Sequence, residues 1–173
     1  MPNAVGVKLY TGQTKRRSSR KDTPTMNSAA SSMQLTRGAD YAIRIMIHLA
    51  GLPENERVLL PTLAAAANAP ASFLSKVLQA LTRADLIASR RGQQGGFEIL
   101  ARGRQATILE VVEAIDGPIR LNVCLEHGAG CGRKNWCVAH PVWQQAQDAM
   151  VAVLRTSTVT ELAGKAATGA VEK

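Results

Sequence analysis

The segment from residue 60 to residue 100 constrains the fold more than any other part of the chain. A short alanine-rich helix is predicted to start near Pro61, because proline suits the first position of a helix, and to end at Asn68-Ala69-Pro70. A longer helix is predicted over residues 71–84, with a buried stripe formed by Phe73, Leu74, Val77, Leu78 and Leu81. A short helix, a tight turn and a longer helix with a polar outer face are the pattern of a helix-turn-helix.

A glycine-rich hairpin is predicted directly after these helices. Two strand-like runs, residues 86–91 and 97–100, are joined by Gly92-Gln93-Gln94-Gly95-Gly96. A hairpin in this position is the wing of a winged helix. At its base and just beyond it lie four arginines, Arg90, Arg91, Arg102 and Arg104. We expect this cluster to lie beside a phosphate backbone.

Further helices are predicted on both sides of this unit. One spans residues 36–51, a second runs from the capping box of Thr107 and Glu110 to Asp116, and a short last one runs from Thr158 to about Gly164. Between them, a long helix starts at Pro141, with one apolar seam formed by Val142, Ala146, Ala149, Met150, Val153 and Leu154. The predicted fold class is mainly α with a small β-hairpin: a winged helix-turn-helix domain plus a long dimerisation helix.

Most of the net charge of +8 lies at the N-terminus. Residues 1–32 hold six basic side chains and one acidic one, with many polar residues and no sustained apolar periodicity, so we expect a disordered basic extension. Two interpretations stay open: an unstructured tail or misassigned start, and a basic arm that touches DNA phosphates. The longest apolar run, residues 41–52, is too short to span a bilayer, so we expect no membrane partner.

The three cysteines of the chain, Cys124, Cys131 and Cys137, lie in one short polar segment that His140 follows. An odd number of clustered cysteines does not suit a disulfide framework. Three thiolates and one imidazole suit an iron–sulfur cluster or zinc. The lack of a Cys-x-x-Cys pair favours the cluster over zinc, and a metal-free thiol sensor stays open.

A thiol enzyme that uses one of these cysteines with His140 or His127 is a competing interpretation. A nucleophile needs a nearby base and a substrate pocket. The sequence offers neither an oxyanion loop nor a third orienting residue, so we do not expect an enzyme.

Three segments together resemble the Rrf2 superfamily of bacterial winged-helix regulators. Residues 35–44 (LTRGADYAIR) resemble its opening, residues 73–78 (FLSKVL) with Leu81 resemble its recognition helix, and residues 89–97 resemble its wing. The resemblance spans Met33 to about Ala163. It implies a cytoplasmic, homodimeric transcriptional regulator that binds a palindromic promoter site, with half-sites roughly 34–36 Å apart.

The resemblance also implies a cofactor. Family members that sense iron–sulfur status or nitric oxide have three cysteines in this loop, which implies a cluster held by Cys124, Cys131 and Cys137. The run CVAHPVW from Cys137 resembles the member in which the matching histidine, here His140, is the fourth ligand of a [2Fe–2S] cluster. Asp40 matches a position that supplies a carboxylate to a [4Fe–4S] cluster in another member, and is the alternative fourth ligand. We expect [2Fe–2S], with iron, redox or nitric oxide status as the signal.

The DNA-contacting residues are expected on the recognition helix and the wing: Ser72, Ser75, Lys76, Gln79, Arg90 and Arg91. Ser75 stands where the iron–sulfur cluster regulator has a glutamate that tunes DNA specificity, so its operator is not expected to carry over. The resulting division of the chain is a basic extension (1–32), a winged helix-turn-helix domain (33–106), a linking helix and cysteine loop (107–140), a dimerisation helix (141–165) and a disordered tail (166–173).

Overall fold

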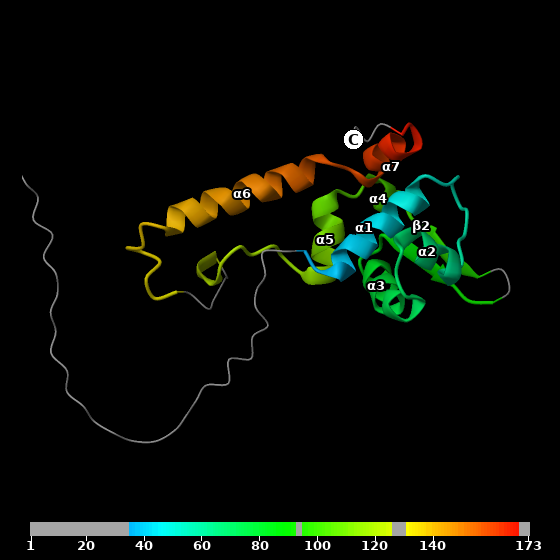
Figure 1. The fold of residues 1–173 in the computed structure, drawn as a ribbon, viewed down its shortest axis with the longest axis horizontal. Coiled ribbons are helices and arrows are strands. Elements are labelled where there is room, and N and C mark those ends of the chain that lie inside the picture. The colour runs from blue at the N-terminus through cyan, green and yellow to red at the C-terminus, as the bar shows by residue number, and fades with distance from the viewer. Residues whose placement is uncertain (1–34, 93–94, 126–130, 170–173) are drawn as a thin grey trace, which may run out of the picture. The chain divides into compact units, whose positions relative to one another are not determined.

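The computed structural model describes residues 35–92, 95–125 and 131–169 (Figure 1). Its helices are α1 (Arg37–Ala50), α2 (Leu60–Ala67), α3 (Ala71–Arg83), α4 (Ala101–Gln105), α5 (Ile108–Asp116), α6 (His140–Thr156) and α7 (Val159–Ala167), and its strands are β1 (Ile87–Arg90) and β2 (Gly96–Ile99). The predicted basic extension, the tip of the wing and His127 lie outside these residues.

Helix α1 is the central element of the described core. Thr36 caps its start, since the Thr36 hydroxyl accepts a hydrogen bond from the backbone N–H of Ala39 at 3.2 Å. Its apolar face is fully buried and consists of Ala39, Ala42, Ile45, Met46 and Leu49. This face packs against α2, α3, α5 and α7. The apolar residues that recur every three to four positions in this segment therefore belong to a helix that other helices cover on its apolar face.

Helices α2 and α3 form the predicted helix-turn-helix. Asn68 ends α2 in a left-handed backbone conformation with φ 51°, which asparagine tolerates better than most residues, and Pro70 precedes α3. The buried residues of α3 are Leu74, Val77, Leu78 and Leu81. The prediction that Phe73 belongs to this stripe is wrong. Its side chain is 45% exposed and lies edge-on against Tyr41, with the ring centroids 5.6 Å apart.

The wing is a two-stranded antiparallel hairpin, as predicted. Ile87 pairs with Ile99 at its base and Arg90 pairs with Gly96 toward its tip. Val58 adds a third backbone partner, because Val58 and Phe97 exchange two N–H···O hydrogen bonds of 2.9 Å. The loop before α2 thereby anchors β2. No turn or strand signal around Val58 in the sequence pointed to this pairing.

A short helix that the sequence did not suggest, α4, follows the wing directly. It runs into α5, whose capping box is formed as predicted. The Thr107 hydroxyl accepts from the backbone N–H of Glu110 at 3.2 Å, and the Glu110 carboxylate accepts from the backbone N–H of Thr107 at 2.8 Å. These bonds satisfy donors at the start of α5 that would otherwise lack partners.

The long helix α6 is followed by a return to the core. Backbone hydrogen bonds from Ile108 to Ser157 and from Val159 to Ala106, both 2.9 Å, join the start of α5 to the start of α7. Helix α7 buries Val159 and Ala163 against α1 and α4. It continues to Ala167, past the predicted end near Gly164, so the first two residues of the predicted disordered tail are helical.

Candidate nucleic-acid interface and cysteine segment

The outer face of α3 carries the four polar residues predicted to contact DNA. Because the buried stripe of α3 points to the core, the residues between its members face solvent. All four are exposed: Ser72, Ser75, Lys76 and Gln79. These side chains are short or flexible, so they do not prevent the helix from approaching another molecule closely.

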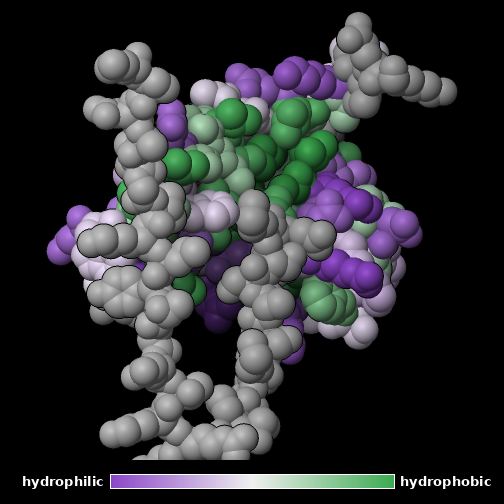
Figure 2. All heavy atoms as spheres, turned by 60° about the vertical axis from the view of Figure 1, so that its left-hand side comes forward, coloured by the Kyte–Doolittle hydropathy of each residue, from purple (hydrophilic) through white to green (hydrophobic). Residues whose placement is uncertain are grey.

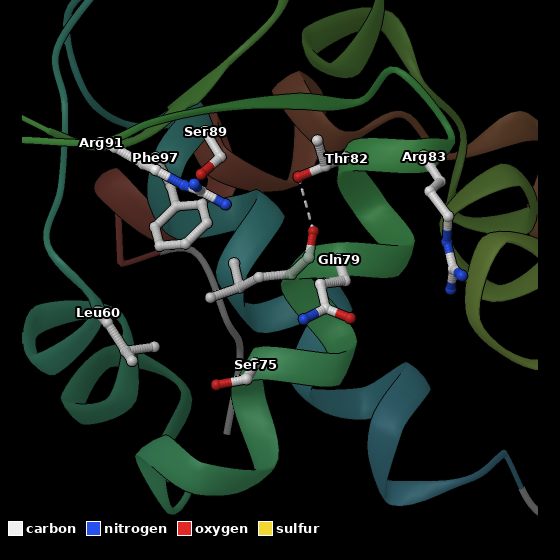
Figure 3. A pocket seen from close by; sticks show the side chains of 9 residues that line it. Leu60, Ser75, Gln79, Thr82, Arg83, Ser89, Arg91 and Phe97 are labelled. Atoms are coloured by element: carbon white, nitrogen blue, oxygen red, sulfur yellow. Dashed lines mark hydrogen bonds between the residues drawn. The ribbon is translucent and has the colours of Figure 1, made fainter.

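A groove of about 480 Å³ separates this face of α3 from the wing (Figure 3). Ser75 and Gln79 line it from α3, and Ser89, Arg91 and Phe97 line it from the wing. Thr82 also lines the groove, but its hydroxyl already donates a hydrogen bond to the Leu78 carbonyl at 2.8 Å. With Arg83 also lining it, the groove offers two serine hydroxyls, an amide and two guanidinium groups over an apolar floor.

The two wing arginines differ in how far they are paired. Arg91 is exposed and, among the described residues, has no ion-pair or hydrogen-bond partner. Arg90 lies 3.7 Å from Glu98, but Glu98 is held more closely by Arg57 at 2.9 Å. The Arg90 side chain is 63% exposed, so its ion pair is screened by water and worth little. Both guanidinium groups can therefore meet an anion without losing a strong partner.

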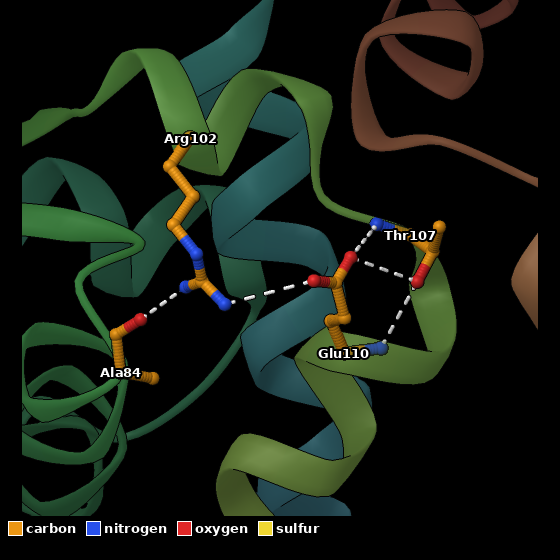
Figure 4. A network of polar contacts seen from close by, with 4 residues as sticks. All are labelled: Ala84, Arg102, Thr107 and Glu110. Carbon is orange, nitrogen blue, oxygen red and sulfur yellow. Dashed lines mark hydrogen bonds and ion pairs between the residues drawn. The ribbon is translucent and has the colours of Figure 1, made fainter.

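Arg102 and Arg104, unlike Arg90 and Arg91, bind backbone carbonyls of the protein itself, and the expectation that they lie beside a phosphate backbone stays a prediction. Arg104 donates to the carbonyls of Ala50 and Leu52 at 2.9 Å and of Pro53 at 3.1 Å. It thus supplies donors to the C-terminal end of α1, where helix carbonyls lack partners. Arg102 donates to the Ala84 carbonyl and lies 3.6 Å from Glu110 (Figure 4). Both side chains are committed to the fold.

Glu110 stands at the centre of this network. The backbone N–H of Thr107 is the main reason that the pKa of its carboxyl lies below the ordinary 4.5, while partial burial opposes the shift. The Thr107 hydroxyl and the positive charge of Arg102 add smaller lowering effects. Glu110 is therefore a structural carboxylate that joins the capping box to α4.

The cysteines occupy different environments. Cys124 is buried in the short 3-10 helix η1 (Val123–Leu125), beside the buried Leu125. Although the segment is polar in sequence, this cysteine is therefore buried with an apolar neighbour. Cys131 and Cys137 are half-buried, and all three are free thiols.

His140 begins α6 and holds an unsatisfied atom. Its ring Nδ1 is buried and has no hydrogen-bond partner, which is costly for a polar group. This orphaned nitrogen, together with three thiols nearby in the sequence, fits the donor chemistry of an iron–sulfur cluster. Within residues 35–92, 95–125 and 131–169, however, no three His, Cys, Asp or Glu side chains lie close enough to hold a metal ion.

The alternative ligand Asp40 is occupied within its own helix. Its carboxylate lies 2.8 Å from Arg44, and Arg44 also donates to the Ala67 carbonyl at 3.2 Å. The pair is exposed, so Asp40 could exchange this partner at little cost.

Comparison with known proteins assigns the family. The model of the Rrf2 family, described as iron-dependent transcriptional regulator, matches residues 35–165. This chain belongs to the Rrf2 family. As a member, it is a transcriptional regulator with a mainly helical winged-helix fold, and the predicted fold class and family resemblance are both confirmed.

Named relatives of this Rrf2-family chain cover most of its length. The HTH-type transcriptional regulator NsrR of Geobacillus kaustophilus is 30% identical over 75% of this chain and 89% of that protein. IscR of Cronobacter sakazakii is 28% identical over 75% of this chain and 80% of that one. The solved structure of CymR, the global cysteine regulator of B. subtilis, matches with a TM-score of 0.62 at 24% identity, over 76% of this chain and 96% of CymR.

The long helix α6 of this Rrf2-family chain has two apolar faces rather than the single predicted seam. Met150 and Leu154 are half-buried, and Leu154 packs against the core. The other four seam residues are exposed: Val142, Ala146, Ala149 and Val153. Figure 2 shows apolar side chains gathered in a band on one face of the molecule, with polar ones on either side. None of the described helices has the length and apolar character needed to cross a membrane.

Proposed function

We propose that this chain is a homodimeric transcriptional regulator that binds a palindromic promoter site and whose DNA binding is controlled by an iron–sulfur cluster. The observation that carries the DNA-binding half is the exposed polar face of α3 beside a groove that Arg91 lines from the wing. An α-helix of this kind fits the major groove, where Ser, Gln and Lys side chains reach base edges and phosphates. The wing, with Arg90 and Arg91, lies along the backbone. Such a regulator acts in the cytoplasm, where the bacterial chromosome lies.

The exposed face of α6 supports the homodimer. Val142, Ala146, Ala149 and Val153 recur at intervals of four, three and four residues, which is the spacing of a two-helix seam. The two alanines at its centre allow a second helix to approach closely. Val142 and Val153 are 64% and 66% exposed, an unfavourable state for valine unless a partner covers them. A second copy of the same helix offers the same stripe around a two-fold axis.

One polar contact connects the cysteine segment to this helix. Gln147 is the one buried polar residue in the described part of the chain, and its side-chain oxygen accepts a hydrogen bond from the backbone N–H of Leu121 at 3.1 Å. Leu121 lies three residues before Cys124. A rearrangement around Cys124 would therefore displace α6 through Gln147. A displaced α6 would in turn change the distance between the two recognition helices of the dimer.

The cluster itself is supported by the family description, by the relatives named IscR and NsrR and by the donor set. Cys124, Cys131 and Cys137 would hold it, with His140 as fourth ligand and Asp40 as the alternative. When bound, the cluster supplies a centre that iron supply, oxidation or nitric oxide alters. Because the described ligands are not gathered, holding a cluster requires the segment to close around it.

A second candidate is a regulator of the same fold that uses zinc or free thiols. The observation that favours the free-thiol version is that the three cysteines are free and ungathered in the described residues, whereas zinc would need the same gathering as a cluster. CymR, which shares the fold, is described as a cysteine regulator. In this version, Cys131 and Cys137, the two more accessible thiols, would carry the response.

The visible spectrum of protein purified without oxygen distinguishes these candidates. We expect a coloured protein with sulfide-to-metal charge-transfer bands, and loss of that colour in a Cys131→Ala variant. The variant that removes the fourth ligand, His140→Ala or Asp40→Ala, is expected to lose the cluster, while the other keeps it. His48→Ala, within α1, is the matched control. A colourless protein with one zinc per chain, or with no metal, would refute the iron–sulfur proposal.

A further inference from the structure

A second pocket lies on the other side of α3 from the wing groove. It measures about 320 Å³ and is bounded by the start of α1, by α3 and by the end of α5. Three of its lining residues are basic: Arg37, Lys76 and Arg83. Its floor is apolar and is formed by Phe73, Val77 and Ile115.

These three cations are unpaired among the residues that the structure describes. Asp116, at the end of α5 beside the pocket residue Ile115, is held by another pocket residue, Thr36. One of its oxygens accepts from the Thr36 hydroxyl at 2.6 Å and the other from the Thr36 backbone N–H at 3.2 Å. Asp40, on the next turn of α1, lies 2.8 Å from Arg44 and forms its ion pair there rather than with the pocket. The pocket therefore gathers three positive charges that lack a counter-charge from the protein.

The position of the pocket relative to α3 indicates which anion could supply the missing negative charge. Arg83 lines both the wing groove and this pocket, so the two hollows flank the same helix. The major groove of DNA is about 12 Å wide and is bordered by two phosphate backbones, while an α-helix with its side chains is about 10–12 Å across. A helix seated in that groove has one backbone on each side. The wing side of α3 meets one backbone, and the pocket of Arg37, Lys76 and Arg83 meets the other.

We propose that this pocket binds a backbone phosphate of the DNA strand opposite the one that the wing contacts. Arg37 and Arg83, to which the sequence assigned no role, are then phosphate ligands, and Lys76 contributes from the edge of the recognition helix. The apolar floor keeps water from one side of the phosphate and so strengthens its attraction to the three cations. This inference rests on the DNA-binding function proposed above.

Salt titrations of DNA affinity test the inference. The variants are Arg37→Gln and Arg83→Gln. The control is Lys165→Gln, which removes one charge from an exposed position of α7, a helix that lies on the other side of α1 from α3 (Figure 1). Two duplexes of equal length are used, one with the preferred palindrome and one unrelated. Circular dichroism melting of each variant checks that the fold is intact.

We expect both arginine variants to weaken binding to the two duplexes by the same factor, because phosphates carry no sequence information. The slope of log K against log salt should become shallower by about 0.9 for each phosphate that the variant no longer neutralises, and so by about twice that in a dimer. The Lys165→Gln variant should keep the wild-type slope.

Three outcomes would overturn the inference. Wild-type DNA binding with an unchanged slope in Arg37→Gln and Arg83→Gln would refute the pocket alone. No DNA binding by the wild type would refute the proposed function and the pocket with it. An unchanged slope together with a rise in melting temperature in inorganic phosphate, seen in the wild type but not in Arg37→Gln, would assign the pocket to a free anion instead.

Discussion

Among the glycines that the structure describes, Gly103 leaves the least room for an added methyl group. A Cβ at this position in α4 would collide with the carbonyl oxygen of Leu86 and lie 3.0 Å from the Ile99 side chain. That carbonyl already accepts from the backbone N–H of Leu100 at 3.1 Å, a bond that ties β1 to the end of β2. The backbone there cannot move aside without loosening the base of the wing.

We therefore expect Gly103→Ala to lower the free energy of unfolding by about 2–3 kcal/mol, as overpacking against backbone does. Urea denaturation followed by circular dichroism measures it. Gly164→Ala is the matched control, since a Cβ there in α7 meets open space. The control should gain about 0.5–1 kcal/mol from the better helix propensity of alanine. Equal stability of Gly103→Ala and wild type would contradict the packing described for α4.

Glu110 gives the fold a pH dependence at its acid end. Hydrogen bonding by Thr107 lowers its pKa in the folded state below the ordinary 4.5. The stabilisation is therefore fully present above that ordinary value, and it is lost as the pH falls through the lowered folded pKa. Glu110→Gln keeps a side chain that can complete the capping box but removes the titration. The melting temperature of Glu110→Gln should fall less than that of wild type between pH 7 and about pH 3; parallel curves would contradict this role.

The arginines show how far the sequence could resolve individual residues. Four of them cluster around the wing in the sequence, yet Arg90 and Arg91 are exposed while Arg102 and Arg104 bind backbone carbonyls. Sequence spacing reports nearness along the chain, whereas the end of α1 reaches Arg104 only through tertiary packing. The same limit applies to Arg37, which lies far from Lys76 in sequence and lines one pocket with it.

At the scale of elements, the sequence predicted the helices with strong apolar periodicity and the hairpin with its glycine-rich turn. It missed α4 and the pairing of Val58 with Phe97, because a five-residue helix and a single bridge leave no periodic signal. The sequence-based prediction also assigned apolar residues from two different faces of α6 to a single seam. Residues on both faces are apolar, and only the packing of Leu154 against the core separates the face used within the chain from the exposed one.

The exposed stripe of α6 leads to a prediction about assembly. Ala149→Glu places a charge at the centre of the proposed helix pair, where burying it without a partner is costly. We expect this variant to sediment as a monomer and to lose most of its affinity for palindromic DNA. Ala152→Glu is the matched control, because Ala152 is exposed on the flank of the same helix, about a quarter-turn from the middle of the stripe. If Ala149→Glu and Ala152→Glu both remain dimers, α6 does not form the interface.

In the whole molecule, the proposed DNA-binding surface, the proposed dimer helix and the cysteine segment are connected. The first rests on α3 and its two flanking hollows, the second on the exposed stripe of α6, and the third meets the second at the hydrogen bond between Gln147 and Leu121. The proposed gathering of the cysteines around a cofactor has no counterpart in the described residues, where no three candidate ligands lie together. It depends on a group that the polypeptide does not itself contain.

Selection of DNA fragments from the protein's own genome tests whether the protein recognises a promoter site. Purified protein, prepared without oxygen and again after removal of any metal, is mixed with sheared genomic DNA, and the bound fragments are sequenced. We expect enrichment of promoter fragments that share an inverted repeat, with half-sites about one helical turn apart, in at least one of the two preparations. Bound fragments indistinguishable from the input DNA in both preparations would contradict this expectation.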